Sequence, residues 1–307
     1  MKRKILIIGG PTAVGKTDLS IEAALLLNGE IVSADSMQIY RYMDIGSAKP
    51  TPEERSRVPH HLVDEIDPAQ SFSVFEYQKR ARAAIEDIFS RGKTPVIAGG
   101  TGLYVNSLIY NMDFSERPDD NSFRKEMEAL AEREGTEALH RLLAGKDPEA
   151  GKRIHPNNTK KIIRALEILE EGQERVKSFE ESFVKNEDYD RCLIGLTRDR
   201  EELYDRINRR VDILIEAGLV DEVQSLKGMG LTEDDISMKG IGYKEVFSYL
   251  HGEYDLEEAV RIIKRNTRHY AKRQLTWFRR YDDIHWINLS EVSHEDALEE
   301  ICRLMNE

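Results

Sequence analysis

The hydrophobic pattern in the first third of the chain alternates between short apolar runs and longer segments with helical periodicity. Residues 5–8, 31–34 and 95–98 form apolar runs of strand length, and residues 74–91 repeat apolar positions at helical spacing behind a capping box. Strands that alternate with helices predict a parallel sheet with helices packed on its faces. We therefore expect an α/β fold.

The strand pattern stops between residues 118 and 189, where three helical segments follow one another. It resumes with a strand at 191–196, a long helix that Gly218 ends, two further helices, a short strand at 284–287 and a last amphipathic helix. This order predicts a core made by residues 1–117 and 190–307, interrupted by an all-helical insertion domain at 118–189.

The turn after the first strand carries a phosphate-binding motif. Its sequence GPTAVGKT meets the spacing G-x-x-x-x-G-K-T in full, and an apolar helix follows it. The glycines let backbone N–H groups point inward, the lysine adds a mobile positive charge, and the threonine hydroxyl can bind Mg²⁺. We predict a P-loop NTPase-like parallel sheet flanked by helices, with Thr17 as the metal ligand and with a diphosphate or nucleotide bound by Gly10, Pro11, Thr12, Ala13, Val14, Gly15, Lys16 and Thr17.

Further polar side chains are expected at the same edge of the sheet. Asp35 and Ser36 follow the second strand, and a GGTG turn that contains Thr101 leads from the third strand into a helix. Because the carboxyl ends of parallel strands share one edge, Asp35 and Thr101 can face the P-loop across a ligand.

Three arginines lie on the helix after residue 199, namely Arg206, Arg209 and Arg210. Guanidinium groups on such a helix can close over a phosphate opposite the P-loop lysine. The alternative is a solvated helix face in which Glu202 and Asp205 pair with them.

Composition restricts the class of protein. Of 307 residues, 40% are hydrophobic and 33% charged, and no apolar run approaches the ~20 residues that span a bilayer. We expect a cytoplasmic protein with no membrane partner and take a monomer as the starting assumption. Cys192 and Cys302 are isolated and favour ordinary thiols. His60 and His61, in the loop-rich stretch 45–68, lack a third ligand and are interpreted as packing or positioning residues.

The charge is unevenly distributed. A net charge of −12, from 45 basic and 57 acidic residues, taken alone argues against a nucleic-acid partner. Segment 261–280, however, has eight Lys or Arg and no Asp or Glu. Since screening limits each charge to a reach of ~8–10 Å, this segment can hold a phosphate backbone. Its Trp277 and Phe278 are interpreted as core residues rather than base-stacking platforms.

The pattern alone leaves two kinds of enzyme open. One is an ATP-dependent small-molecule kinase, in which Asp35 organises a metal or serves as a base. The other uses the P-loop to hold a diphosphate that leaves. A P-loop module that binds RNA and nucleotide without covalent chemistry is a third possibility, but it leaves the position of Asp35 unexplained.

Eight sequence blocks resemble the tRNA dimethylallyltransferase family, also called tRNA isopentenyltransferases. In chain order they are GPTAVGKT, SADSMQIY, GSAKP, PHHLVD, GGTGLY, IIRALEI, GYKE and TRHYAKRQLTWFR, and they extend over nearly the whole chain. Adenylate prenyltransferases of the cytokinin-forming kind share the P-loop, the aspartate and the threonine turn. The helical insertion and the basic segment 261–280 favour tRNA over a free nucleotide.

The resemblance implies transfer of a dimethylallyl group from dimethylallyl diphosphate to N6 of the adenosine 3′ to the anticodon, position 37, in tRNAs that read codons beginning with U. Diphosphate is released. It implies Asp35 as general base, Thr101 in contact with the substrate, and Lys16, Arg210 and Mg²⁺ at Thr17 around the leaving group.

The resemblance also implies that the insertion grips the tRNA anticodon stem-loop. The implied tRNA contacts are Asp35, Ser36, Met37, Gln38, Thr101, Arg124, Thr159, Lys160, Lys161, Ile162 and Ile163. The chain departs from the family pattern at Asn158 and Lys161, where Asp and Arg are expected. The second change keeps a positive charge but removes a bidentate fork.

Overall fold

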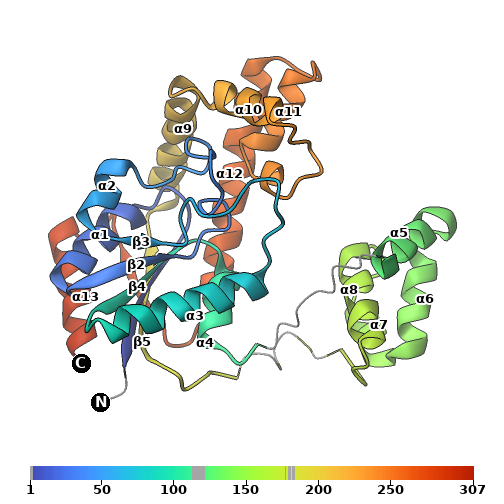
Figure 1. The fold of residues 1–307 in the computed structure, drawn as a ribbon, viewed down its shortest axis with the longest axis horizontal. Helices are drawn as coiled ribbons and strands as arrows, with labels where there is room; N and C mark the ends of the chain where they lie inside the picture. The colour runs from blue at the N-terminus through green and yellow to red at the C-terminus, as the bar shows by residue number, and fades with distance from the viewer. Residues whose placement is uncertain (1–2, 113–121, 177, 179–180, 182–183) are drawn as a thin grey trace. The chain divides into compact units, whose positions relative to one another are not determined.

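The structure is a computed structural model that describes residues 3–112, 122–176, 178, 181 and 184–307. The chain divides into two compact units (Figure 1), one made by Met1–Ile109 with Asn186–Glu307 and the other by Tyr110–Lys185. The sequence prediction placed the ends of the insertion at residues 118 and 189, and residue 118 lies outside the described residues.

The first unit is built on a six-stranded parallel sheet in the order β3-β2-β4-β1-β5-β6. Its strands are β1 (Lys4–Gly9), β2 (Gly29–Ser33), β3 (His60–His61), β4 (Thr94–Gly99), β5 (Asp190–Thr197) and β6 (His285–Asn288). The register pairs Gly9 with Gly99 and Ser33 with Ala98, so three chain segments leave the sheet side by side. The five predicted strands and the P-loop α/β fold are confirmed, and β3 is an addition.

Helices cover both faces of the sheet. On one face lie α1 (Lys16–Leu26) and α13 (His294–Asn306), and on the other α3 (Val74–Ser90) and α4 (Gly102–Ile109) (Figure 1). Alternate strand residues such as Leu6 and Ile8 pack with Leu19 of α1 and Ile301 of α13. The helix predicted at 74–91 is confirmed, with Ser73 and Glu76 forming its capping box.

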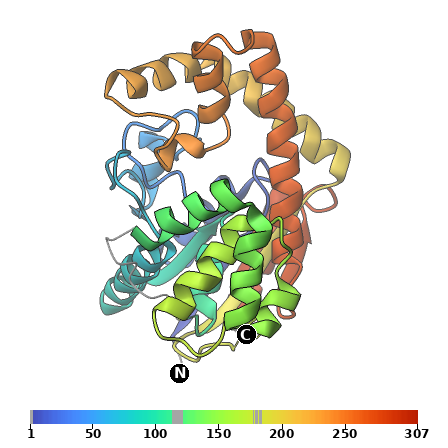
Figure 2. The ribbon, with the colours of Figure 1, turned by 90° about the vertical axis from the view of Figure 1, so that its right-hand side faces the viewer.

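A group of helices stands beyond the carboxyl edge of the sheet. It consists of α9 (Arg200–Glu216), α10 (Leu219–Gly228), α11 (Tyr243–Leu250) and α12 (Leu256–Phe278), with a 3₁₀ turn at Ser237–Lys239. The long α12 packs along α9, α11 and α4 (Figure 2). Two helices of the first unit were not predicted, α10 and the short α2 (Pro52–Arg57).

The second unit is helical. Its described residues form α5 (Ser122–Glu134), α6 (Thr136–Lys146), α7 (Pro148–Arg153) and α8 (Thr159–Glu170), one helix more than predicted. The extra helix is α7, whose first turn Asp147 caps. Apolar side chains including Met127, Leu143 and Leu166 form a core of their own. Throughout the described ranges, no helix has both the length and the apolar character that crossing a bilayer requires.

Candidate phosphate-binding site and adjoining cavity

The P-loop joins β1 to α1 through backbone conformations that require glycine. Gly10 has φ +153°, and a Cβ there would lie 2.7 Å from the carbonyl oxygen of Leu196. Gly15, in the left-handed region at φ +112°, is the N-cap of α1. The loop therefore curls tightly over the N-terminus of α1, where free N–H groups and the helix dipole favour an anion.

Two arginines hold the outer side of this loop. Arg206 Nε donates to the carbonyl of Ala13 at 2.9 Å, and Arg198 Nε donates to the carbonyl of Val14 at 2.9 Å. Because the C=O and N–H of a trans peptide point in opposite directions, these bonds turn the N–H groups of Val14 and Gly15 away from the arginines. For Arg206 the sequence left open a phosphate contact or a solvated helix face, and Arg198 was not identified from the sequence.

Lys16 reaches back across the loop. Its Nζ donates to the carbonyl oxygens of Gly10 at 3.0 Å and Pro11 at 2.7 Å. Burial lowers the pKa of Lys16 to about 8, with Asp35 acting to raise it and Arg210 to lower it. The lysine therefore stands between a carboxylate and a guanidinium, and a phosphate bound here would add negative charge beside it.

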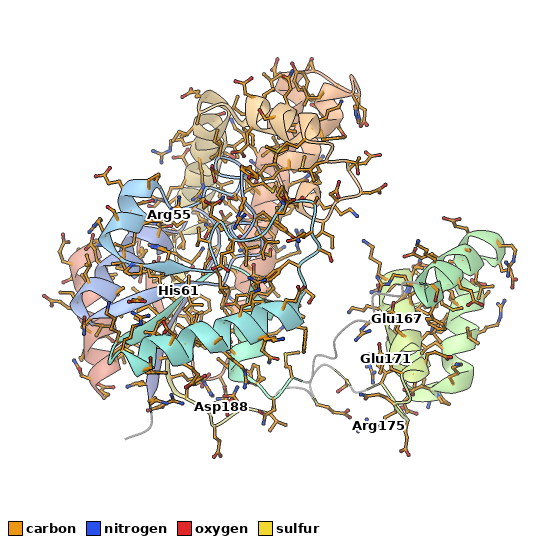
Figure 3. All side chains as sticks on the ribbon, in the orientation of Figure 1. Arg55, His61, Glu167, Glu171, Arg175 and Asp188 are labelled. Atoms are coloured by element: carbon orange, nitrogen blue, oxygen red, sulfur yellow. The ribbon has the colours of Figure 1, made fainter. Side chains whose placement is uncertain are left out.

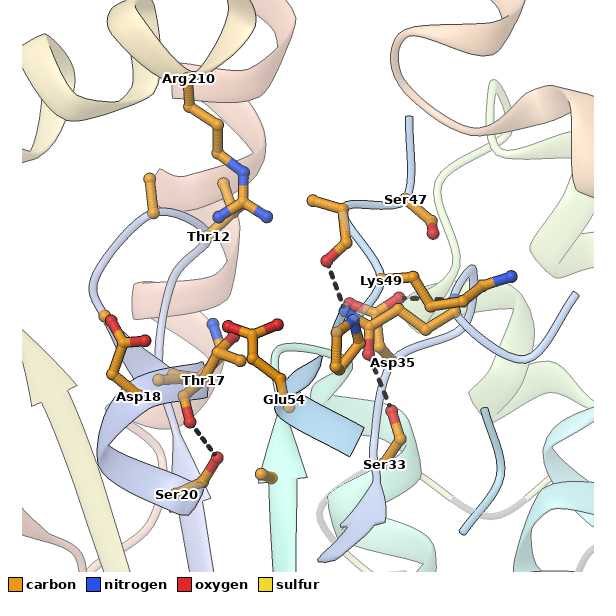
Figure 4. A pocket seen from close by; sticks show the side chains of 18 of the residues that line it. Thr12, Thr17, Asp18, Ser20, Ser33, Asp35, Ser47, Lys49, Glu54 and Arg210 are labelled. Carbon is orange, nitrogen blue, oxygen red and sulfur yellow. Dashed lines mark hydrogen bonds between the residues drawn. The ribbon is translucent and has the colours of Figure 1, made fainter. Parts of the chain in front are cut away.

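The three arginines predicted on α9 have different surroundings. Arg210 extends from α9 towards Thr12 of the P-loop (Figure 4) and lines the cavity. Burial lowers the pKa of Arg210, yet an arginine stays charged at neutral pH. Arg209 is two-thirds exposed and pairs with Asp205 at 2.5 Å. All three arginines line the cavity, but Arg206 also supports the loop and Arg209 forms the solvated pair that was the alternative.

Asp35 lies directly after β2 in a tight turn. Its Oδ1 accepts the N–H groups of Met37 at 2.8 Å and Gln38 at 3.4 Å, which fixes the carboxylate relative to the backbone. Thr101 Oγ1 accepts the N–H of Ser36 at 3.1 Å. Asp35 lines the cavity beside the P-loop, whereas Thr101 supports the turn from behind and lines neither of the cavities described below.

The GSAKP loop is held by a carboxylate from α10. Glu222 accepts backbone N–H groups from residues 44, 45 and 46 at 2.7–3.0 Å, and also the hydroxyl of Tyr243 at 2.8 Å. Buried Lys49 donates to Asp44 at 2.5 Å and Asp64 at 2.9 Å. Lys49 therefore anchors the loop through two carboxylates, and it also lines the cavity beside the P-loop.

The two adjacent histidines have separate partners. His60 Nδ1 lies 2.8 Å from the carbonyl of Val58, and its ring lines the cavity. His61 Nε2 lies 2.8 Å from buried Glu30, and Figure 3 marks its place at the edge of the sheet. These contacts agree with packing and positioning roles.

Two cavities meet at Asp35. One, of about 550 Å³, is lined by Thr12, Lys16, Thr17 and Arg210 together with polar residues such as Ser33 and Gln38 (Figure 4). The other, of about 430 Å³, is lined by apolar and aromatic residues including Met37, Phe72, Tyr104, Ile207 and Ile263. Lys239, Lys244 and Arg273 also line it. Both cavities share Thr12, Asp35, Ser47, Ala48, Arg210 and Tyr270, of which Tyr270 was not identified from the sequence.

The predicted RNA contacts of the second unit lie on α8, except Arg124, which lies on α5. Asn158 caps this helix by accepting the N–H of Lys161, so the amide fills a capping role that Asp also performs. Ile162 and Ile163 are buried in the core of the unit, so their side chains do not face solvent. Arg124 forms a bidentate ion pair with Glu167 at 2.7 and 2.9 Å, and Figure 3 marks Glu167 in this unit.

The fold and the site define an α/β P-loop protein whose phosphate site opens at a carboxylate onto an aromatic cavity. The chain belongs to the IPP transferase family, which it matches over residues 38–281. The resemblance drawn from the sequence is therefore confirmed.

Individual relatives match over almost the whole chain. A tRNA dimethylallyltransferase of Alkaliphilus oremlandii is 55% identical over 300 residues, which cover 98% of this chain and 96% of that protein. The crystal structure of a full-length tRNA isopentenylpyrophosphate transferase from Bacillus halodurans is 46% identical, with a TM-score of 0.74 and coverage of 99% and 97%. A eukaryotic dimethylallyltransferase, described as acting on tRNA, is 27% identical, with a TM-score of 0.83 and coverage of 98% and 78%.

Proposed function

We propose that this protein transfers a dimethylallyl group from dimethylallyl diphosphate to N6 of the adenosine at position 37 of tRNA. The observation that carries this proposal is the junction at Asp35 of a phosphate-binding cavity and an aromatic one. The names of its relatives, tRNA dimethylallyltransferases, support tRNA as the acceptor. A tRNA substrate would place the reaction in the cytoplasm.

The leaving group is stabilised at the P-loop. When the allylic C–O bond breaks, negative charge grows on the departing diphosphate. Donors aimed at that position lower the barrier because they act where the charge develops. The N–H groups of the loop, the ammonium of Lys16 and the guanidinium of Arg210 line this cavity and suit the task.

Asp35 is the proposed proton acceptor. The adenine amino group is a poor nucleophile because its lone pair is delocalised into the ring. As the new N6–C bond forms, a carboxylate that takes the N6 proton assists the attack. Asp35 lines both cavities, so it can reach a base in one and the reacting carbon in the other.

Mg²⁺ is the proposed metal. Among the described residues no group of three or more His, Cys, Asp or Glu side chains forms a metal site. A single hydroxyl at Thr17, completed by diphosphate oxygens and water, fits the usual binding of Mg²⁺ to phosphates. When bound, the metal would neutralise charge on the leaving group.

The acceptor base must leave its stack to reach Asp35. The aromatic cavity offers rings and apolar side chains for an unstacked base, and its lysines and Arg273 suit a phosphate backbone. The helical unit would hold the anticodon stem through the first turn of α8, where Thr159, Lys160 and Lys161 lie. Arg124 would have to leave or share Glu167 to contact RNA.

A label-transfer assay tests the proposal. Protein with Mg²⁺ and labelled dimethylallyl diphosphate is incubated with an unmodified anticodon stem-loop that contains consecutive adenosines, or with AMP. We expect labelled RNA. Labelled AMP without labelled RNA would indicate an adenylate prenyltransferase, and transfer to neither acceptor alongside tight ATP binding would exclude prenyl transfer.

Substitution of Asp35 tests its role. Asp35→Asn keeps an oxygen for the N–H of Met37 but removes the basic carboxylate. We expect turnover to fall about 10²- to 10⁴-fold with RNA affinity nearly unchanged. Exposed Asp234→Asn is the matched control and should leave turnover unaltered. Equal turnover in the Asp35 variant and the wild type would remove Asp35 from the proton transfer.

A further inference from the structure

One face of α12 lies against the GGTG turn. A Cβ at Gly100 would stand 2.1 Å from Gln274 Nε2, and a Cβ at Gly102 would stand 2.0 Å from the ring of Trp277. Only glycine allows the helix to approach so closely. The helix that carries the basic segment is therefore also part of the wall of the site.

Gln274 connects this turn to the P-loop. Its Oε1 accepts the N–H of Thr12 at 2.9 Å, and its Nε2 donates to the carbonyl of Gly100 at 2.9 Å. The side chain is 5% exposed, so neither bond is readily replaced by water. β1 and β4 pair only as far as Gly9 and Gly99. Past the end of the sheet, the Gln274 amide links the two turns.

Tyr270, one helical turn before Gln274, extends the connection to Asp35. Its hydroxyl lies beside the side chains of Thr101 and Gln274. Thr101 in turn accepts the N–H of Ser36, next to Asp35. A continuous series of contacts therefore runs from the P-loop through α12 to the turn that holds the carboxylate.

We propose that Gln274 is a positioning residue that fixes the distance between the leaving-group site at the P-loop and the proton-accepting site at Asp35. This inference rests on the proposed prenyl transfer. The reacting carbon must lie about 3–3.5 Å from the attacking nitrogen, and a displacement of about 1 Å can lower the rate about a hundredfold. A side chain that holds both backbone turns sets that distance through the backbone, although Gln274 also lines the phosphate-binding cavity.

Two substitutions of Gln274 distinguish the contributions of its two hydrogen bonds. Gln274→Glu keeps an acceptor for the N–H of Thr12 but places an oxygen against the carbonyl of Gly100. Gln274→Met removes both bonds at similar volume. We expect kcat to fall about tenfold to a hundredfold in each variant, whereas KM for either substrate stays within about twofold.

Phe278→Leu is the matched control. Phe278 is fully buried one turn further along α12, where its ring fills the space beside Gly9. The variant loses packing in the same helix but keeps the Gln274 bonds, so Tm falls while kcat stays within about twofold. If the Gln274 variants lose no more kcat than Phe278→Leu, or if KM rises in proportion, the positioning role is wrong.

Deuterium exchange tests the bridge without relying on turnover. In Gln274→Met, uptake should rise in peptides that cover residues 9–16 and 99–104, and not in β5. Unchanged exchange at both turns would overturn the inference even if the wild type transfers the prenyl group. A wild type that transfers no label, but whose turns respond in this way, would overturn the proposed function and leave the bridge intact.

Discussion

At the scale of a single residue, the charge of Lys16 depends on what the P-loop holds. Burial lowers its pKa to about 8, and a bound diphosphate would raise that pKa by adding adjacent negative charge. The free protein loses this charge as pH rises through about 8, so affinity for Mg²⁺-pyrophosphate should fall over that range. Binding at pH 8 should take up about half a proton at Lys16, and almost none at pH 6.5.

The measurement is titration calorimetry in buffers with different ionisation enthalpies. Lys16→Arg serves as the control, because arginine keeps its charge throughout this range and cannot take up the proton. Protonation of the ligand itself is common to both proteins and cancels in the difference. Equal proton uptake by wild type and Lys16→Arg would show that Lys16 is already fully charged in the free protein.

At the scale of secondary-structure elements, one carboxylate holds together the edge of the sheet. Glu30 on β2 is 2% exposed and accepts from Arg91 at 2.7 Å and from Lys93 at 2.7 Å, with His61 of β3 at 2.8 Å. The hydrogen bond from Arg91 is the largest cause that holds the pKa of Glu30 well below its usual range. These contacts link β2, β3 and the ends of α3 and β4.

Glu30→Gln should lower the free energy of unfolding at pH 7 by about 1–3 kcal/mol, because the cations lose a buried partner. The folded pKa lies below the unfolded value of 4.5, so the contribution is complete above that pH and is lost as pH falls towards the folded value. Urea unfolding should therefore show a difference in the free energy of unfolding between wild type and Glu30→Gln that is smaller at pH 4 than at pH 7. Exposed Glu53→Gln should change stability by less than about 0.5 kcal/mol. A difference in the free energy of unfolding between the two proteins that stays constant down to pH 3 would contradict this account.

The elements that the sequence reveals are those with local signals. An apolar run, a glycine loop and an apolar helix are contiguous, so the P-loop and the position of Asp35 after the second strand could be predicted. The start of α2 also carried a local signal, a capping box of Thr51 and Glu54 with Pro52 between them, which the surrounding prolines obscured. In contrast, β3 is a strand only because two residues pair with β2.

The supporting side chains of the site could not be predicted in the same way. Gln274 binds backbone groups that lie 174 and 262 residues away in the chain. Arg198 binds a P-loop carbonyl 184 residues away, and Glu222 binds backbone N–H groups 176 to 178 residues away. Because these bonds are made to backbone groups, they do not require particular side chains in the segment that is bound, and no sequence pattern reveals them. Such residues become visible only when the tertiary structure brings the segments together.

At the scale of the whole molecule, phosphate chemistry and the predicted stem contacts belong to different units. The P-loop, Asp35 and both cavities lie in the first unit. The two chain segments that enter and leave the second unit pair with each other, since Asn111 N–H donates to the carbonyl of Val184 at 2.8 Å and Asn186 N–H to that of Ile109 at 3.0 Å. A linker of about four residues can therefore replace 113–183.

We expect this deletion variant to fold, because the first unit keeps its own core, and to bind Mg²⁺-pyrophosphate like the wild type. Its KM for tRNA should rise at least about tenfold, and the salt dependence of tRNA binding should become less steep, since phosphate contacts are lost. The full chain with Lys160→Glu and Lys161→Glu is the matched control. It should also raise KM for tRNA and make the salt dependence of tRNA binding less steep. If tRNA affinity and salt slope survive the deletion unchanged, the basic segment 261–280 of the first unit holds the RNA by itself.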